Sequence, residues 1–383
     1  MRLFFLIYHY FPFGGQQRDF FRIAEACRAR GHDIEVYALR WQGPLPAGFN
    51  ITLVPIKALS RLSMYRRYTD WVAGRIEGSR PDLVIGFNKM PHLDVYFAAD
   101  DCFLHKAKTQ RGPLYPFTPR FRHFRRYEAA VFGRESQTRA LVLSPLQRKN
   151  YLNHYPDCAQ RLQDMPPGID QERRIERRDP LVRSALREEL GVSDDQWLIL
   201  QVGSGFRIKG VDRAIRAIAS LPEKLRGSVR YVLIGQDRAD PYRHLAKKLG
   251  LANQVEILPG RDDIPRFMVG ADLLLHPAYM ESAGYVLLEA TVSGLPVLTT
   301  ASCGYAWHIE QAQSGEVCSD PFTQDELNAR LGVMLSNLDS APWSENGLTY
   351  GKQPELYSLA SAAVRYIEGR ADAVKSESQA LAT

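Results

Sequence analysis

The sequence predicts an α/β protein built from two Rossmann-like domains, each with a parallel sheet covered by helices on both faces. The chain has 383 residues, more than a single hydrophobic core ordinarily organises. Short apolar runs alternate along it with segments of helical periodicity, which is typical of βαβ units. This alternation restarts at residue 197, after a stretch at 166–180 that is rich in Pro, Arg and Asp. We therefore expect the boundary between the two domains in that stretch.

The first half opens with an apolar strand at 2–8 and a helix whose Phe20, Ile23, Ala24 and Cys27 lie on one face. Its further strands are expected in the runs DIEVYAL, ITLVPI, DLVIGF and ALVLS. In the second half, strands are expected in WLILQVG, YVLIG, VEIL, DLLLHP and PVLTT, with a helix in VDRAIRAIASL.

The expected domains cover residues 1–170 and 171–351. A helix at about 352–370 is expected to pack back onto the first domain, and the tail 371–383 to be disordered. In sheets of this kind, ligands bind beyond the carboxyl ends of the strands, so the loops that follow the strands are where functional residues are expected.

The composition indicates a folded protein of a reducing compartment. Hydrophobic residues make up 45% of the chain and charged residues 24%, as in ordinary globular domains. The net charge of +6 favours an anionic partner, whether phosphate, nucleotide, nucleic acid or acidic lipid. The five cysteines are scattered without a CxxC pair, which argues against a disulfide framework or a zinc site. The apolar start is too short and interrupted for a signal peptide or a membrane span, so a soluble or peripheral protein is expected.

Two glycine-rich loops follow the first strands of the two halves. In FPFGGQQRDF, Gly14 and Gly15 either let an anion approach free backbone N–H groups or serve a turn that needs positive φ. In QVGSGFRIKGVDR, Arg207 and Lys209 stand beside a helix start, where a lysine adds a point charge for a pyrophosphate; an exposed basic loop is the alternative. Neither the dinucleotide fingerprint G-x-G-x-x-G nor a P-loop is present.

The stretch HPAYMESAGYVLLEATVSGLPVL holds two glutamates eight residues apart, Glu281 and Glu289, around a helix start. The N–H groups of residues 282–284 would stabilise a phosphate at the positive end of that helix. Glu289 lies in a helix that looks buried on nearly all sides, where a carboxylate needs a partner such as the diol of a ribose. Glu281, in the loop, could reach a sugar hydroxyl. The alternative has Glu281 as a helix cap partner and Glu289 as a solvated residue.

This stretch is similar to the E-x7-E signature of group 1 retaining glycosyltransferases of the GT-B fold. Together with YFPFGGQQRDFFRIA, GFNKMPHLDVYFAADDCF, PPGID, QVGSGFRIKGVDRAI, IGQD and ADLLLHPAY, the chain resembles the lipopolysaccharide core heptose α-1,3-glucosyltransferase (glucosyltransferase I) family, over nearly all residues before about 369. The resemblance implies a GT-B fold and transfer of a hexose, by default glucose, from a UDP-sugar to an inner-core heptose. Domain 171–351 would bind the UDP-sugar, and domain 1–170 would face the acceptor and the membrane.

The resemblance also implies roles for single residues. Glu289 would hold the ribose, Lys209 the pyrophosphate, and Glu281 the donor sugar. The donor-binding set is Gly15, Arg173, Arg207, Lys209, Arg261, Ser282, Ala283, Gly284, Tyr285 and Glu289. Asp19 would lie near the acceptor, and Asn88 and Lys89 are candidates to touch its phosphate, with a solvated loop as the alternative. Relatives carry arginine where this chain has Ser204 and Ile208, which leaves the details of the phosphate clamp open.

The expected chemistry is retaining and metal-independent. No D-x-D pattern is present to carry a metal on the diphosphate, so Lys209, arginines and helix dipoles would neutralise the departing UDP. No metal or other cofactor is expected. No carboxylate stands out as a nucleophile, and the resemblance favours attack on the same face, with the β-phosphate accepting the proton. Glu281 and Asp100 are the catalytic candidates; Asp100 would orient the acceptor hydroxyl, or else cap a helix.

The segment from Phe103 to Phe132 interleaves basic and aromatic residues. Its expected membrane contacts are Arg120, Phe121, Arg122, Phe124, Arg125 and Arg126. Such a pattern suits an interfacial helix on anionic lipid, which a lipid-anchored acceptor would require. The expected location is therefore cytoplasmic, peripheral on the cytoplasmic face of the inner membrane. A core-packed helix with a solvated basic face is the alternative, and no nucleic-acid motif accompanies the pattern.

Other functions remain possible at this level. UDP-galactose or a UDP-N-acetylhexosamine could replace UDP-glucose, since the sugars differ by one hydroxyl or an amide. Sugar-nucleotide epimerases share the two-domain architecture, but they need no acceptor and no lipid-facing segment. A non-catalytic scaffold is disfavoured by the intact Glu281, Glu289 and Lys209, and an NAD oxidoreductase by the missing fingerprint.

Overall fold

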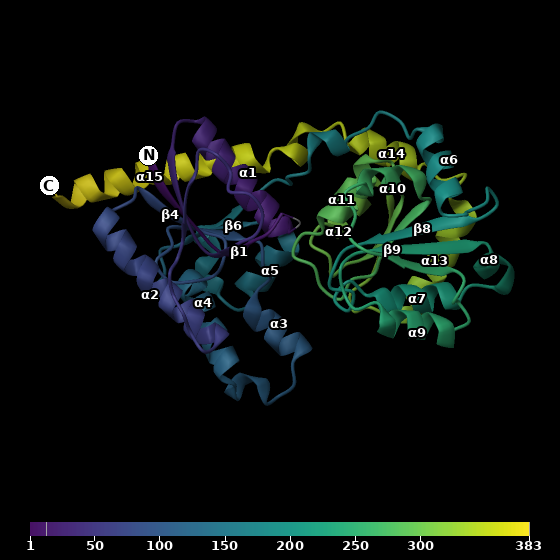
Figure 1. Cartoon of the computed structure of the whole chain (residues 1–383), viewed down its shortest axis with the longest axis horizontal. Coiled ribbons are helices and arrows are strands. Elements are labelled where there is room, and N and C mark those ends of the chain that lie inside the picture. Colours follow the sequence, from purple (N-terminus) through teal and green to yellow (C-terminus); the bar gives the residue numbers. More distant parts are fainter. Residues whose placement is uncertain (13, 383) are drawn as a thin grey trace. The chain divides into compact units, whose positions relative to one another are not determined.

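The computed structural model describes residues 1–12 and 14–382, with side chains up to 376. The chain forms two compact units (Figure 1). The first comprises residues 1–168 with the segment from 358 onward, and the second comprises residues 169–357. Each unit is built around its own parallel sheet, as the alternating pattern predicts.

The first unit has a seven-stranded sheet in the order β3-β2-β1-β4-β5-β6-β7, all neighbours parallel. Its strands are β1 (Arg2–Tyr10), β2 (Asp33–Trp41), β3 (Asn50–Leu53), β4 (Leu83–Gly86), β5 (Val95–Ala98), β6 (Arg139–Val142) and β7 (Leu162–Asp164). Its helices are α1 (Gly15–Ala29), α2 (Arg61–Ser79), α3 (Phe103–Gln110), α4 (Pro119–Phe132), α5 (Pro145–Leu152) and α15 (Leu359–Ala382), with 3₁₀ turns η1 (Tyr115–Phe117) and η2 (Pro156–Arg161).

The second unit has a six-stranded sheet in the order β10-β9-β8-β11-β12-β13, again all parallel. Its strands are β8 (Trp197–Val202), β9 (Val229–Ile234), β10 (Val255–Leu258), β11 (Leu273–His276), β12 (Val297–Thr300) and β13 (Gly315–Cys318). Its helices are α6 (Pro180–Glu189), α7 (Val211–Ala219), α8 (Glu223–Gly227), α9 (Asp240–Lys248), α10 (Ile264–Gly270), α11 (Tyr285–Val292), α12 (Ala306–Ala312), α13 (Gln324–Asn337) and α14 (Trp343–Tyr350), with 3₁₀ turns η3 (Gln171–Arg173) and η4 (Pro354–Tyr357).

The strand order in both sheets reverses beside the first strand, at β1–β4 and at β8–β11. Such switch points are where doubly wound sheets bind ligands, because the loops on either side diverge there. The glycine-rich loops after β1 and β8 and the E-x7-E stretch after β11 all lie at these points. The sequence pattern thus predicts two parallel sheets and places its main motifs after their strands, although β5, β7 and β13 are absent from the expected strands.

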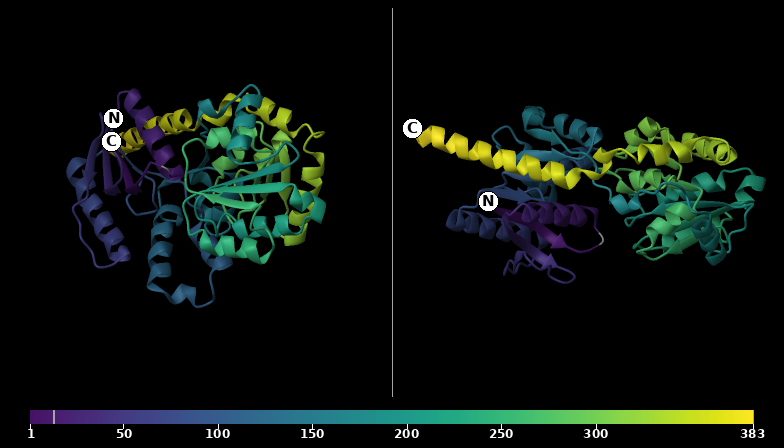
Figure 2. Two further views of the ribbon diagram at one scale, coloured as in Figure 1. Left: turned by 45° about the vertical axis from the view of Figure 1, so that its right-hand side comes forward. Right: turned by 90° about the horizontal axis from the view of Figure 1, so that it is seen from above.

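The C-terminal helix α15 contacts α1 and belongs to the first unit (Figure 2). Glu368 fixes it there, because its Oε1 accepts hydrogen bonds from Arg30 at 2.7 Å and pairs with His32 at 2.9 Å. The expectation of a disordered tail is wrong for residues 371–382, which continue α15; Thr383 lies outside the described residues. No Gly or Pro follows Gly369, so a helix already nucleated by packing propagates at little cost.

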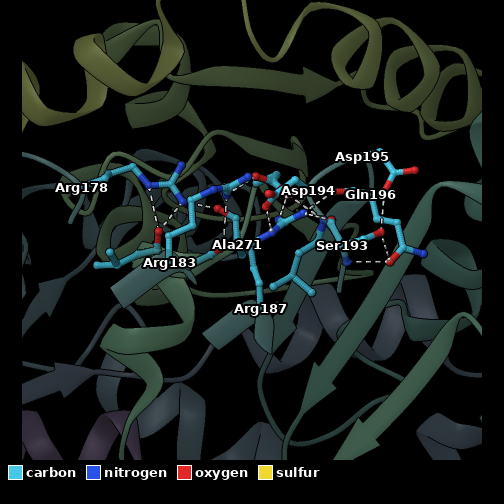
Figure 3. Close-up of polar contacts among 12 residues, drawn as sticks. Arg178, Arg183, Arg187, Ser193, Asp194, Asp195, Gln196 and Ala271 are labelled. Atoms are coloured by element: carbon cyan, nitrogen blue, oxygen red, sulfur yellow. Dashed lines mark hydrogen bonds and ion pairs between the residues drawn. The ribbon is translucent and has the colours of Figure 1, made fainter. Parts of the chain in front are cut away.

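An arginine network fixes the first helix of the second unit to the strand that carries the E-x7-E stretch (Figure 3). Arg187 donates to Asp272 Oδ2 at 3.0 Å, and Arg183 pairs with the other oxygen of the same carboxylate. Arg178 donates to the carbonyl oxygens of Val269 and Ala271, and burial lowers its pKa to about 10. Because Asp272 immediately precedes β11, the network holds that strand from its amino end.

Candidate donor and acceptor sites

The carboxyl end of β11 carries the strongest candidate site of the second unit. The strand ends at His276, and the loop that follows leads into α11 through Gly284, which has φ +98°. That conformation is accessible to glycine without strain, so Gly284 allows a tight entry to the helix. The N–H groups of the first turn of an α-helix have no partner within the helix and carry partial positive charge. Since α11 begins at Tyr285, Gly284 and Tyr285 lie at its amino end, whereas Ser282 and Ala283 precede it in the loop.

Glu281 is held between a cation and an imidazole. Its Oε1 forms an ion pair with Lys209 Nζ, and its Oε2 lies 2.7 Å from His276 Nε2. The side chains are largely buried, with 16% of Glu281 and 19% of Lys209 exposed, while His276 is fully buried. The loop backbone is fixed as well, since Glu281 N donates to Ser302 O at 3.1 Å and its carbonyl accepts from Gly304 N at 2.9 Å. The carboxylate thus has a defined position in the loop.

The charge balance of this cluster keeps Glu281 ionised. Burial alone raises the pKa of a carboxyl group, but the Lys209 ammonium and the hydrogen bond with His276 outweigh burial and lower the pKa of Glu281 to about 2. Cys303 lies close by, and burial together with the charge of Glu281 raises the pKa of its thiol to about 11.

His276, Glu281 and Cys303 could in principle hold a metal, because their ligand atoms lie within 4.8 Å of one another. The carboxylate is already engaged, because the Lys209 ammonium pairs with one of its oxygens and His276 Nε2 contacts the other. We therefore interpret the cluster as a polar network around Glu281.

The basic loop between β8 and α7 is fastened to this site. Tyr279 N donates to Ile208 O at 2.8 Å, and a Cβ on Gly210 would lie 2.0 Å from Pro277 O, so only glycine fits at that position. Lys209 directly precedes Gly210, the N-cap of α7, as the sequence predicts. Arg207 is exposed on the same loop. Ser204, which replaces the expected arginine, accepts a hydrogen bond from Gln236 N at 3.0 Å and so shapes the loop.

Glu289 lies one turn after Tyr285 on α11, and the two share a helix face. It is 7% exposed, and the helix is buried from Leu287 to Val292, which confirms the expectation of a carboxylate in an enclosed helix. Its burial excludes the alternative of a solvated residue.

The two other arginines expected on the donor side have contacts within the second unit. Arg261 donates to both carboxylate oxygens of Asp263, at 2.7 and 2.8 Å, and also pairs with Glu189 at 3.5 Å. These contacts anchor α10 to α6, so Arg261 has a structural role here. Arg173 lies near the opposite end of α11 from Glu281, with its carbonyl 3.5 Å from Ser293 Oγ. Its Nη1 is buried and has no hydrogen-bond partner among the described residues.

In the first unit, the glycine pair after β1 starts α1. Neither Gly14 nor Gly15 has positive φ, so the turn does not require glycine for its backbone conformation. A Cβ on Gly14 would lie 1.9 Å from the side chain of Gln17, whereas nothing described lies within 4 Å of a Cβ on Gly15. Gly15 therefore leaves open space at the amino end of a 15-residue helix, as an approaching anion needs. Asp19, on the same helix, is buried, with 2% of its surface exposed.

The loops after β4 and β5 carry the other acceptor candidates. Asp100 follows β5 and is exposed, while its carbonyl is fixed by Tyr151 Oη at 2.8 Å and by Gln147 Nε2 at 3.1 Å. An exposed carboxylate on a fixed backbone suits an orienting role. Asn88 uses its Oδ1 to accept from Tyr8 N at 2.7 Å.

Lys89 is not a solvated loop residue or a free phosphate ligand. Its ammonium lies in the interior, bound to Glu128 Oε2 at 2.7 Å and Asp101 O at 2.6 Å. Sequence reasoning missed Glu128, although the apolar residues around it in RRYEAAVF are the same signal that identifies Glu289.

The basic and aromatic segment forms an excursion of α3, η1 and α4 from the first unit (Figure 1). Phe117 belongs to η1 and not to α4, because Pro119 starts that helix after the Thr118 cap. Phe121 and Phe124 pack on Phe103 with ring centroids 5.7 and 5.6 Å apart. The exposed apolar residues lie instead at the tip.

At that tip, Leu114 is 76% exposed and Phe117 is 77% exposed. Arg120, Arg122, Arg125 and Arg126 on α4 are exposed as well. The excursion therefore has one feature of each alternative. Its aromatic face is packed inside, as in a core-packed helix, and its exposed tip is apolar with basic residues beside it, as in an interfacial helix. Among the helices in the described part of the chain, none is long and apolar enough to span a bilayer.

Comparison with known proteins agrees with this architecture. Residues 13–173 match the family model of glycosyltransferase family 4, and residues 182–347 match that of glycosyl transferases group 1. The chain is 44% identical to the lipopolysaccharide glucosyltransferase WaaG of Escherichia coli, over 96% of this chain and 99% of that protein.

Solved structures show the same relationship. A crystal structure of WaaG, described as a glycosyltransferase involved in lipopolysaccharide biosynthesis, has a TM-score of 0.89 at 44% identity and covers 96% of this chain and 100% of that chain. The Anabaena protein HepE in complex with UDP and glucose has a TM-score of 0.72 at 18% identity, covers 97% of this chain and 100% of that chain, and so shares the fold. With two parallel Rossmann-like units and this degree of identity over nearly its full length, the chain belongs to the WaaG family of group 1 glycosyltransferases and has the GT-B fold.

Proposed function

We propose that this protein transfers glucose from UDP-glucose to a heptose of the lipopolysaccharide inner core, with retention of configuration. The observation that carries the proposal is the fixed, ionised Glu281 beside Lys209 and the amino end of α11. It is supported by the 44% identity to a lipopolysaccharide glucosyltransferase over nearly the whole chain.

The donor would occupy this site in three parts. The N–H groups of residues 282–285 and the Lys209 ammonium bind the diphosphate, since both present positive charge. The buried carboxylate of Glu289 accepts hydrogen bonds from the ribose diol, and Glu281 accepts one from a hexose hydroxyl. When the diphosphate arrives, Lys209 exchanges part of its ion pair with Glu281 for the phosphate oxygens.

The transfer would proceed on one face of the hexose. The acceptor oxygen forms its bond to the anomeric carbon as the bond to the UDP oxygen breaks, and a β-phosphate oxygen takes the acceptor proton. Lys209 and the α11 dipole stabilise the negative charge on the departing UDP. This arrangement needs no metal ion. Asp100 orients the acceptor hydroxyl by accepting its hydrogen bond.

The lipid-anchored acceptor would be reached from the inner membrane surface. The exposed tip residues Leu114 and Phe117 insert among acyl chains, while the α4 arginines contact anionic headgroups. The protein would then act at the cytoplasmic face of the inner membrane as a peripheral protein.

The decisive experiment measures UDP release with UDP-glucose, UDP-galactose, UDP-N-acetylglucosamine and UDP-N-acetylgalactosamine, each with and without heptose-terminated core lipopolysaccharide. We expect release above background only with UDP-glucose and the acceptor together. Equal turnover with another donor would replace glucose in the proposal. Interconversion of a UDP-sugar without any acceptor would support a sugar-nucleotide epimerase instead.

A further inference from the structure

His276 is a buried histidine whose two ring nitrogens have very different surroundings. It is the last residue of β11 and is fully buried. Its Nε2 lies 2.7 Å from Glu281 Oε2, whereas its buried Nδ1 has no hydrogen-bond partner among the described residues. Its backbone is held too, because Thr299 Oγ1 donates to its carbonyl oxygen at 2.9 Å. Among the described residues, Glu281 is thus the hydrogen-bond partner of the ring.

The protonation of the ring follows from its partner. Glu281 is a carboxylate and can only accept, so Nε2 must carry the proton and donate it. The Nε2–H group of His276 therefore fixes one oxygen of Glu281.

The two oxygens of Glu281 differ in how easily their partners can leave. Lys209 is a long, partly exposed side chain on a loop, and the diphosphate of a donor competes for its ammonium. His276 belongs to a central strand and is fully enclosed, so it keeps its place. When Lys209 turns toward phosphate, Oε1 becomes available while Oε2 stays held.

We propose that His276 is a positioning residue: it fixes the carboxylate of Glu281 through Oε2 so that Oε1 is presented to a hydroxyl of the donor hexose. The proposal deepens the proposed function and rests on it. It assigns His276 to recognition of the sugar and not of the UDP portion, because it acts only through Glu281. The backbone bonds from Ser302 and Gly304 keep the loop in place when the ring is changed, so the effect falls on the side chain of Glu281.

The test compares His276→Leu, which removes the hydrogen-bond donor to Glu281, with His276→Gln, which restores an N–H group at a similar distance from the backbone. Each variant is made in the wild-type chain and in the Glu281→Ala chain. Affinities for UDP and for UDP-glucose are measured by calorimetry, which remains informative when turnover is lost, and kcat/KM is measured where turnover allows. We expect His276→Leu to lower kcat/KM and UDP-glucose affinity about tenfold or more, with UDP affinity within about twofold, as loss of a hydrogen bond to a charged group implies. His276→Gln should recover most of the loss.

In the Glu281→Ala background, His276→Leu should have no further effect on UDP-glucose affinity, because its target is gone. Multiplicative losses in the double variant, or equal losses of UDP and UDP-glucose affinity, would show a general structural role and overturn the proposal. These outcomes differ from failure of the proposed function, in which the wild-type chain itself neither binds UDP-glucose more tightly than UDP nor transfers glucose.

Discussion

Lys89 and Glu128 form an ion pair in the interior of the first unit, with 2.7 Å between Nζ and Oε2. The side chain of Glu128 is 0% exposed and that of Lys89 is 11% exposed. Glu128 Oε2 also accepts from Phe103 N at 2.5 Å, and its Oε1 accepts from Leu104 N at 3.0 Å. One carboxylate on α4 thus connects the start of α3 to the loop after β4, and it holds the whole excursion against the sheet.

Removing the charge of Glu128 should therefore destabilise the first unit. Glu128→Gln leaves the Lys89 ammonium buried without a counter-ion, which costs about 3 kcal/mol or more for a pair of this kind. Thermal unfolding followed by circular dichroism should show a lower midpoint. The control is Glu25→Gln, which breaks the exposed Glu25–Arg28 pair and should change stability by less than about 1 kcal/mol. Similar midpoints for the two variants would contradict the prediction.

The pKa of Glu281 gives a pH-dependent prediction with a definite sign. Its folded-state pKa is about 2, below its ordinary value of 4.5, so unfolding must take up a proton in mildly acidic solution. The stability that the ionised group contributes is present above pH 4.5 and is lost as the pH falls toward 2. The difference in melting temperature between the wild type and Glu281→Gln should shrink over that range. Glu345 is exposed, so Glu345→Gln is the matched control. A difference in melting temperature between the wild type and Glu281→Gln that stays the same down to pH 2 would contradict the ion pair.

How far the sequence predicts the site depends on what each residue contacts. Glu281 and Lys209 are predictable because they lie between a strand end and a helix start, where the local pattern fixes position. Glu289 is predictable because apolar residues surround it in its helix. Lys89 and Arg261 look the same in sequence, as basic residues in loops after strands. The partner of Lys89, Glu128, comes from a distant segment, so only the tertiary structure shows that this cation is engaged. Arg261 bonds mainly to Asp263, two residues later, and more weakly to the distant Glu189.

The same distinction applies to His276 and to the tail. A histidine at a strand end gives no sign in sequence that it will bond to a carboxylate five residues later, since a loop must fold back to bring them together. Residues 371–382 lack the apolar periodicity of a packed helix, yet α15 extends through them because its earlier turns are anchored on α1. The sheets can be predicted from local periodicity, whereas these two features depend on how a loop folds back and how a helix packs on its neighbour.

Glucose transfer should be independent of metal ions. The positive charges that would stabilise the departing UDP belong to Lys209 and the α11 amino end, so a chelator removes nothing that the reaction uses. The initial rate in excess EDTA should lie within about twofold of the untreated rate, a change too small to reflect loss of a charge-stabilising group. Elemental analysis of the purified protein should find no stoichiometric metal. Loss of activity in EDTA with recovery in Mn²⁺ would refute this mechanism.

Asp100→Asn should reduce transfer without unfolding the protein. The exposed carboxylate contributes little to stability, while its fixed backbone lets it act on an acceptor hydroxyl. We expect kcat/KM for transfer to fall about tenfold to a hundredfold, the range for loss of a charged hydrogen bond. Asp33→Asn is the control, because Asp33 is exposed at the opposite, amino end of β2. Near wild-type transfer by Asp100→Asn would exclude Asp100 from the acceptor site.

Membrane binding should depend on the arginines of α4 in a charge-specific way. Arg122 and Arg125 are exposed on that helix, and each basic residue near an anionic surface contributes about 1 kcal/mol of binding. Charge reversal at both positions should weaken flotation with anionic vesicles by a factor of about thirty or more. The control reverses Lys247 and Lys248, two exposed lysines on α9, and changes net charge equally.

A second comparison separates the electrostatic contribution from the apolar one. Phe117→Ser at the exposed tip should weaken binding to anionic vesicles while leaving its salt dependence unchanged, because the α4 arginines remain. The double charge reversal should instead remove most of the salt dependence. Two outcomes would contradict the role of α4: equal binding of the wild type to neutral and anionic vesicles, or an α9 reversal that weakens binding as much as the α4 reversal. In either case α4 is a core-packed helix with a solvated basic face, and the protein reaches its acceptor without help from this excursion.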